Sequence, residues 1–398
     1  MRSMVGRGLL TVLRSRAAAD PVEPVAARPT QRLQSLDVFR GLTIAAMLLV
    51  NNPGTWSHVY PPLEHAEWNG WTPTDLVFPF FLFIVGIATA LSLGGLREAG
   101  TGRAQVFRKA LVRAGIIFGL GLLLQGFPHY DLPHLRIPGV LQRIAIAYLL
   151  TAIVVLLTGM RGQVLTLLGL LLGYWTLMTV VPVPGVGRGV LEPAKNLSNW
   201  LDFRLLGVNH VWQETRTWDP EGLLSTLGAV ASVLCGVLAG HWIRSRRGTD
   251  AKALGLFYAG STTLLLGWVW SHIFPINKSL WTSSYVLLSA GLACLVLSAI
   301  LWLVDIEGYR GWTVPFLVFG TNAITAYWLS TLCGIVLDWI TIAGPEGEPV
   351  VLKTYLYEAY YASWLAPANA SLAYAVSYVV VWLGLLSFLY RRRIFIRI

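Results

Sequence analysis

The residue whose chemistry stands out first is His65, in the segment Glu64-His-Ala-Glu-Trp-Asn-Gly-Trp-Thr-Pro-Thr-Asp75. An imidazole can accept a proton near neutral pH, or act as a nucleophile and form an acyl-imidazole. Trp68 offers an aromatic face on which a sugar ring can stack, although aromatic residues near span ends also serve as interfacial anchors. Asn51 lies close enough in sequence to orient the His65 ring or to donate to a developing oxyanion. A lone loop histidine more often has no function, so the surrounding sequence decides.

That sequence predicts a helix start directly after His65. Thr72 is expected as the N-cap, Pro73 at the first helical position, and Asp75 as the residue that reaches back to cap. An apolar run follows to about Leu93. The pattern therefore predicts a histidine placed just before a membrane-spanning helix.

Composition requires the remaining elements to lie in a membrane. Of 398 residues, 55% are hydrophobic and 13% are charged, whereas soluble domains carry roughly 25% charged residues. Apolar runs long enough to cross a bilayer recur along the chain, and they lack the short alternating segments of a β-barrel. The predicted fold is an all-α, polytopic membrane helix bundle.

About ten membrane spans are expected. Their residue ranges are 36–52, 74–95, 105–127, 138–159, 163–182, 222–243, 252–274, 283–304, 313–341 and 369–390. With both termini cytoplasmic, most of the 30 lysines and arginines fall on the inner side, as the positive-inside rule requires. Residues 1–34 are expected to form a mostly disordered cytoplasmic tail.

Neither the net charge nor the cysteines indicate a nucleic-acid partner or a bound metal. The net charge of +10 is explained by the inner-side cations, so no nucleic-acid partner is predicted. The three cysteines lie inside apolar runs, and no cysteine or histidine spacing matches a metal site. We therefore predict no bound metal.

Other polar residues within or beside the spans are candidates for binding. Asp37 and Arg40 lie three residues apart on one helix face, where they form an ion pair or offer Arg40 to a cytosolic anion. Arg143 falls in the outer half of a span, which marks function by default, with Glu221 or Asp75 as candidate partners.

Three more candidates lie in or near the outer loops and spans. Asp219-Pro-Glu221 is expected to start the sixth span, with Asp219 as the N-cap and Glu221 left for function. Lys278 is the single cation of a short outer loop, where it can meet an acidic group. Asn322 lies on the ninth predicted span, where a polar side chain needs a partner.

A set of short sequences in one order carries a family resemblance. The pieces are Arg32-Leu-Gln-Ser-Leu-Asp-Val-Phe-Arg-Gly41, Val50-Asn51, His65-Ala-Glu-Trp-Asn-Gly70, Thr74-Asp-Leu-Val-Phe-Pro79, Arg136-Ile-Pro-Gly-Val-Leu-Gln-Arg143, Asp219-Pro-Glu-Gly222, Pro275-Ile-Asn-Lys-Ser-Leu-Trp281 and Gly320-Thr-Asn322. Together they resemble the heparan-α-glucosaminide N-acetyltransferase family and its bacterial relatives.

The resemblance implies a transmembrane acetyltransferase domain over residues 35–398. Such a protein takes the acetyl group of cytosolic acetyl-CoA, its co-substrate, and delivers it to a glucosamine amine on the outer face. The family's active histidine falls on His65 and its nearby asparagine on Asn51. A homodimer is also implied. Because the animal proteins' large extra-membrane domain is absent, we expect a bacterial relative in the inner (plasma) membrane.

The candidate site residues divide by the side of the membrane. His65 and Asn51 are the expected catalytic pair, and Arg40 with Asp37 is the expected acetyl-CoA site. The expected amino-sugar contacts are Trp68, Asp75, Arg143, Glu221, Lys278 and Asn322. Whether His65 acts as a general base or becomes acetylated stays open, and so does the identity of the acceptor. The rival function is a transporter or flippase for a polar or lipid-linked sugar.

Overall fold

The computed structural model describes residues 33–398 except 99, 217, 345–347 and 397–398. The expected tail at 1–34 therefore lies outside the described residues, apart from its last two positions. Gln34–Ile398 forms one compact unit.

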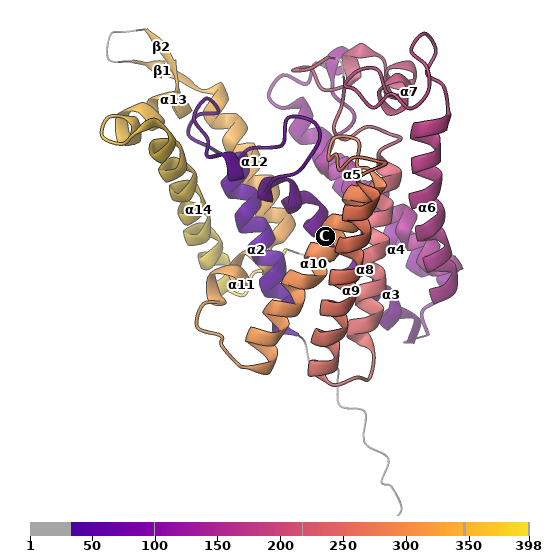
Figure 1. Cartoon of the computed structure of the whole chain (residues 1–398). Coiled ribbons are helices and arrows are strands. Elements are labelled where there is room, and N and C mark those ends of the chain that lie inside the picture. Colours follow the sequence, from indigo (N-terminus) through magenta and orange to yellow (C-terminus); the bar gives the residue numbers. More distant parts are fainter. Residues whose placement is uncertain (1–32, 99, 217, 345–347, 397–398) are drawn as a thin grey trace, which may run out of the picture. The chain divides into compact units, whose positions relative to one another are not determined.

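The unit is a bundle of long helices (Figure 1). The longer helices are α2 (Gln34–Asn51), α3 (Val77–Glu98), α4 (Arg103–Gly126), α5 (Val140–Leu157), α6 (Met160–Val180), α8 (Thr226–Arg244), α9 (Thr249–Trp270), α10 (Ser283–Leu301), α12 (Ala323–Trp339) and α14 (Pro367–Arg391). The shorter elements are η1 (Pro61–Leu63), η2 (Pro73–Leu76), η3 (Leu132–His134), α7 (Leu197–Leu206), η4 (Val208–His210), η5 (Trp302–Ile306), α11 (Val314–Thr321), β1 (Thr341–Ala343), β2 (Pro349–Val351), α13 (Leu352–Tyr357) and η6 (Glu358–Ala362).

The helices match the predicted all-α membrane bundle. Within the described residues, seven are long and apolar enough to cross a membrane, and an eighth span results if α11 and α12 count as one. The predicted segments 36–52 and 105–127 are also helical, as α2 and α4, but they are not among these seven or eight. The only sheet in the described part is the antiparallel pair β1–β2.

The structure differs from the predicted helices at three places. The ninth span is broken, because α11 and α12 meet at Asn322 with a bend of 84°. The sixth span begins at Thr226 rather than at the Asp219 turn, so Asp219 is not the N-cap of α8. The helix α7 between the fifth and sixth spans was not predicted, and its N-cap is Asn196, which accepts a hydrogen bond from the Asn199 backbone N–H.

Small residues let the central helices pack closely. A Cβ atom on Gly236 of α8 would lie 2.0 Å from the Phe83 carbonyl oxygen of α3, and a Cβ on Gly86 would lie 2.0 Å from the Val233 carbonyl. Close backbone approach through small residues is the usual way that membrane helices associate. It fixes α3, which directly follows the segment that carries His65 and Asp75, against α8.

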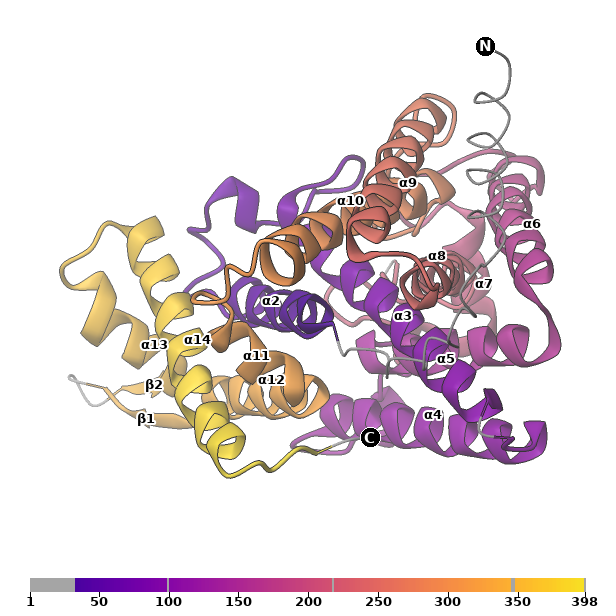
Figure 2. The same cartoon turned by 90° about the horizontal axis from the view of Figure 1, so that it is seen from below.

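The helix α2 is surrounded by other helices of the bundle. It packs against α3, α10, α11, α12 and α14, and the view in Figure 2 shows α11 and α14 beside it. Gly41 makes this possible, since a Cβ there would overlap the Phe316 carbonyl of α11. The described residues of the long connections 52–72, 181–225 and 340–366 lie at one end of the bundle in Figure 1.

Candidate active site

His65 is half-exposed in the loop before η2, and its nearest polar neighbour is a buried carboxylate. Its Nδ1 lies 2.7 Å from Oδ1 of Asp75, whose side chain is 1% exposed. When Nδ1–H donates a hydrogen bond to the carboxylate, Nε2 is left as the basic nitrogen. This is the arrangement by which a carboxylate orients a catalytic imidazole.

Asp75 holds the histidine loop as well as the imidazole. Its Oδ2 accepts the backbone N–H groups of Ala66 and Thr72, each at 3.0 Å. The second contact is the predicted capping interaction, which is confirmed, although the first turn after Pro73 is a 3-10 helix. One buried carboxylate therefore ties both ends of the segment around His65 to the start of α3.

Lys278 completes the cluster from a distant part of the chain. Its Nζ lies 2.9 Å from Nδ1 and 3.2 Å from Nε2 of His65, and 3.4 Å from Oδ1 of Asp75. Burial lowers the pKa of Lys278, and nearby Arg143 lowers it further, although Asp75 and Glu221 oppose the shift. The prediction that Lys278 meets an acidic group is confirmed, and that group is Asp75.

The loop that carries Lys278 is docked on the histidine loop by residues that sequence reasoning missed. The Gly70 N–H donates to the Ile276 carbonyl at 2.8 Å. The buried Asn277 donates through Nδ2 to Asn69 Oδ1 at 3.2 Å. Asn69 and Asn277 lie within the quoted motifs, but their pairing over 208 positions leaves no signal in the sequence.

A second charged group contains Arg136, the first residue of one of the quoted motifs. Its Nε and Nη2 bind the two carboxylate oxygens of Asp219 at 3.0 and 2.7 Å, and Nη2 also binds Glu221 at 2.6 Å. Burial alone lowers the pKa of Arg136, but Glu221 and Asp219 outweigh burial and raise it. Glu221 is therefore the partner of Arg136.

Arg143 has other partners than the two expected from sequence. Its Nη2 donates to the Gly222 carbonyl at 3.1 Å and to the Ser225 hydroxyl, and its guanidinium lies 5.0 Å from the Trp281 ring centroid. The side chain is 1% exposed. Arg143 thus joins the first turn of α5 to the turn before α8 and to the Lys278 loop.

Trp68 and Asn51 are not joined to His65 by hydrogen bonds. Trp68 donates from Nε1 to the Leu191 carbonyl at 2.9 Å and makes an edge contact with Trp218, 5.3 Å between centroids. Asn51 is exposed at the last position of α2, and no hydrogen bond between its side chain and His65 occurs in the described structure. Its expected role in orienting the ring is left as a proposal.

Three candidate residues lie at the other end of α2. Arg40 Nη1 binds Asp37 Oδ1 at 3.1 Å, so the predicted pair is confirmed, and it also donates to the Gly320 carbonyl at 3.4 Å. Asn322 donates to the Ile394 carbonyl and accepts the Ile396 N–H. Asp37 and Asn51 are separated by roughly 21 Å of helix. Asn322 is thus placed with Arg40 and away from His65.

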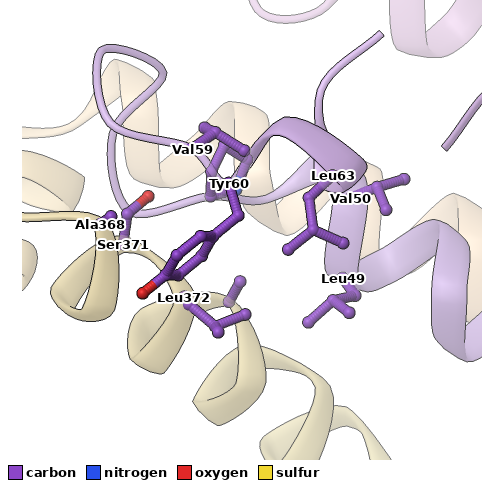
Figure 3. Close-up of a pocket in the computed structure, with 10 residues that line it drawn as sticks. Leu49, Val50, Val59, Tyr60, Leu63, Ala368, Ser371 and Leu372 are labelled. Carbon is purple, nitrogen blue, oxygen red and sulfur yellow. The ribbon is translucent and has the colours of Figure 1, made fainter. Parts of the chain in front are cut away.

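Two hollows lie near the candidate residues. The first, shown in Figure 3, measures about 10 Å³, the space of a single water molecule. There the Tyr60 side chain packs the 52–64 segment against α14, and its hydroxyl donates a hydrogen bond to Asn369 Oδ1. The second measures about 110 Å³ and is bordered by Arg136. Only the second has room for part of a substrate.

Comparison with known proteins gives one family and two curated relatives. The family model described as "Heparan-alpha-glucosaminide N-acetyltransferase, catalytic" matches residues 32–267. The chain is 30% identical over 375 residues to the heparan-alpha-glucosaminide N-acetyltransferase of Mus musculus, covering 79% of this chain and 56% of the relative. The Homo sapiens protein of the same name is 30% identical over 352 residues, covering 74% and 52%. The chain thus spans about half the length of these relatives.

Proposed function

Because the chain belongs to the heparan-alpha-glucosaminide N-acetyltransferase catalytic family, we propose that it is a transmembrane N-acetyltransferase. In this proposal, the acetyl group of cytosolic acetyl-CoA passes to the amine of a glucosamine-type sugar at the outer face. Both termini then lie in the cytoplasm, as the inner-side cations favour. The observation that carries the proposal is the His65–Asp75 pair with Lys278 against the imidazole.

The proposed acetyl transfer can follow either of two routes. In direct transfer, the amine nitrogen of the sugar bonds to the acetyl carbon while His65 Nε2 accepts a proton from that amine. The bond between the acetyl carbon and sulfur breaks. In the covalent route, Nε2 attacks the acetyl carbon, the thiolate leaves, and the amine then displaces the imidazole. Either way the products are an N-acetyl sugar and CoA thiol, and a proton passes to the thiolate.

Lys278 and Asp75 take complementary parts in both routes. Asp75 stabilises the imidazolium that forms when Nε2 accepts a proton. The Lys278 ammonium lies beside the same ring and has a lowered pKa. A group that releases its proton more readily suits protonation of the departing thiolate.

The anionic part of acetyl-CoA has a proposed place at the other end of α2. Its phosphates require cations, and Arg40 there already shares its charge with Asp37. In this proposal the pantetheine arm follows α2 toward His65. Asn51, at the end of that helix, is proposed to donate to the oxyanion of the acetyl group.

The test is acetyl-CoA turnover by the purified full-length protein with glucosamine as the acceptor, measured as released thiol. His65→Ala should lower the rate at least 100-fold, because it removes both the base and the nucleophile. The matched control is His134→Ala. His134 is an exposed loop histidine that also pairs with a carboxylate, 2.8 Å from Asp131.

Three results distinguish the possible outcomes. Full turnover by His65→Ala would contradict both routes, and sugar transport that needs no acetyl-CoA would favour the transporter. Labelled acetyl groups that stay on the protein without an acceptor would select the covalent route over direct transfer.

A further inference from the structure

The cavity of about 110 Å³ lies between three helices at the loop end of the bundle. It is lined by the last two turns of α4, the first turn of α5 and the middle of α12, and its polar side chains are Gln125, Arg136, Gln142, Tyr327 and Thr331. The volume is well above the roughly 10–15 Å³ that one water needs. A polar group of several atoms therefore fits.

Gln142 is the side chain that points to a ligand. It is 2% exposed, and its Nε2 has no hydrogen-bond partner. A buried amide N–H without an acceptor destabilises the fold, because it has lost its hydrogen bond to water without replacing it. Gly121 and Gly139 make room for this amide, since a Cβ atom on either would lie within 2.6 Å of Gln142 Oε1. The amide is thus kept in place although the protein gives its N–H groups no acceptor.

The charge at the border of the cavity selects the ligand class. Among the described residues, Arg136 is the only charged side chain that lines the cavity, and it is already bound by two carboxylates, Asp219 and Glu221. The described lining therefore offers no uncompensated cation to a phosphate or carboxylate group. The amides of Gln125 and Gln142 and the oxygens of Tyr327 and Thr331 provide both donors and acceptors, which is what hydroxyl groups require.

The cavity shares its framework with the histidine cluster. Gln142 and Arg143 are consecutive in the first turn of α5, so their side chains leave the helix about 100° apart. Gln142 borders the cavity, whereas Arg143 contacts Trp281 in the loop that carries Lys278. One helix turn therefore positions the cavity and the cluster relative to each other.

We propose that this cavity is the subsite for the hydroxyl groups of the acceptor sugar, with Gln142 donating to a sugar oxygen. The inference rests on the proposed function and assigns to the acceptor a pocket whose lining cation, Arg136, is already paired and so is not free for the phosphates of acetyl-CoA. Gln142, Tyr327 and Thr331 become specificity-determining residues for the acceptor.

The experiment measures steady-state kinetics of the full-length protein with both substrates varied. Gln142→Leu should raise the KM for glucosamine about 2- to 10-fold, as expected for one neutral hydrogen bond, and leave the KM for acetyl-CoA unchanged. Thr331→Val, on the wall that α12 contributes, should act in the same way. The matched control is Gln163→Leu, since Gln163 is an equally buried glutamine on α6 that pairs with His241 at 2.8 Å.

Deoxy sugars identify the hydrogen bond. One monodeoxy glucosamine should bind less well than glucosamine to the native protein but equally well to Gln142→Leu. A rise in the acetyl-CoA KM in both variants would overturn the subsite, and so would an equal response of native and variant proteins to every deoxy sugar.

Failure of the proposed function gives a different pattern. If the native protein released no thiol with any amino sugar, direct glucosamine binding would be measured by calorimetry. Binding that Gln142→Leu weakens would keep the subsite, whereas equal binding by both proteins would overturn it.

Discussion

Asp75 joins the chemistry of His65 to the local fold. One carboxylate oxygen faces the imidazole and Lys278, and the other accepts two backbone N–H groups. The chain supplies this carboxylate only ten positions after the histidine, as the cap of the next helix. The same side chain therefore fixes the position of the ring and its tautomer.

Asp75→Asn tests that account at the level of one atom. The amide keeps an oxygen for the backbone donors, but it cannot stabilise an imidazolium. The kcat should fall about 10²- to 10⁴-fold, with a change of less than threefold in either KM. Asp131→Asn, at the exposed pair with His134, is the control. Steady-state kinetics check the prediction, and a kcat within threefold of the native value would contradict it.

Asp202 is a buried carboxyl whose ionisation affects stability. It lies on α7, accepts the Leu223 N–H at 2.7 Å, and its Oδ2 has no partner. Burial, with the nearby Asp219 carboxylate, raises its pKa from 3.8 to about 7, against the Leu223 hydrogen bond and Arg143. The folded chain thus holds this proton more tightly than the unfolded chain.

The resulting pH dependence has a definite sign. The stabilisation is complete below pH 3.8 and is lost as the pH rises through about 7, at up to ~1.4 kcal/mol per pH unit between these values. Thermal unfolding in detergent should show this loss in the native protein. Asp202→Asn should show a flatter slope and Asp131→Asn an unchanged one. Equal slopes in the Asp202 variant and the native protein would contradict the assignment.

At the scale of elements, the start of α3 was predictable because its signals are local. Thr72, Pro73 and Asp75 follow one another, and capping requires no knowledge of the rest of the fold. The contact of Lys278 with His65 spans 213 positions. Only the packing of loops fixes it, so the sequence indicated that Lys278 needs an acidic partner without identifying Asp75.

The predicted helix start at Asp219 shows the limit of the same reasoning. Asp219 does cap a turn, since its Oδ1 accepts the Glu221 N–H at 2.8 Å. Its carboxylate also accepts hydrogen bonds from Arg136 and from the Trp212 N–H. These distant partners hold the segment as a turn, and α8 begins at Thr226. Local capping signals cannot reveal such competition.

The packing of α3 on α8 should be sensitive to a single methyl group. Gly236→Ala would place a Cβ 2.0 Å from a backbone oxygen of α3, so the helices must separate. We expect a loss of about 1–3 kcal/mol and a lower melting temperature. Gly119→Ala, on α4, meets no atom within 4 Å and should be neutral or stabilising. Equal melting temperatures for the two variants would contradict the close packing.

At the scale of the whole molecule, the candidate residues fall into two groups along α2. Arg40, Asp37 and Asn322 lie at its first residues, and Asn51 lies at its last. The histidine cluster, Arg136 and the 110 Å³ cavity belong to the loops and helix turns of the other end. The proposed acetyl transfer needs this separation, because its two substrates approach from opposite faces.

The most direct test is sided transfer in sealed proteoliposomes that contain the full-length protein. Labelled acetyl-CoA is supplied only on the face that carries Arg40, and glucosamine only on the face that carries His65. The account predicts that N-acetylglucosamine accumulates on the His65 face with the native protein and with His134→Ala, but not with His65→Ala. Product that forms only when both substrates share one face would contradict it.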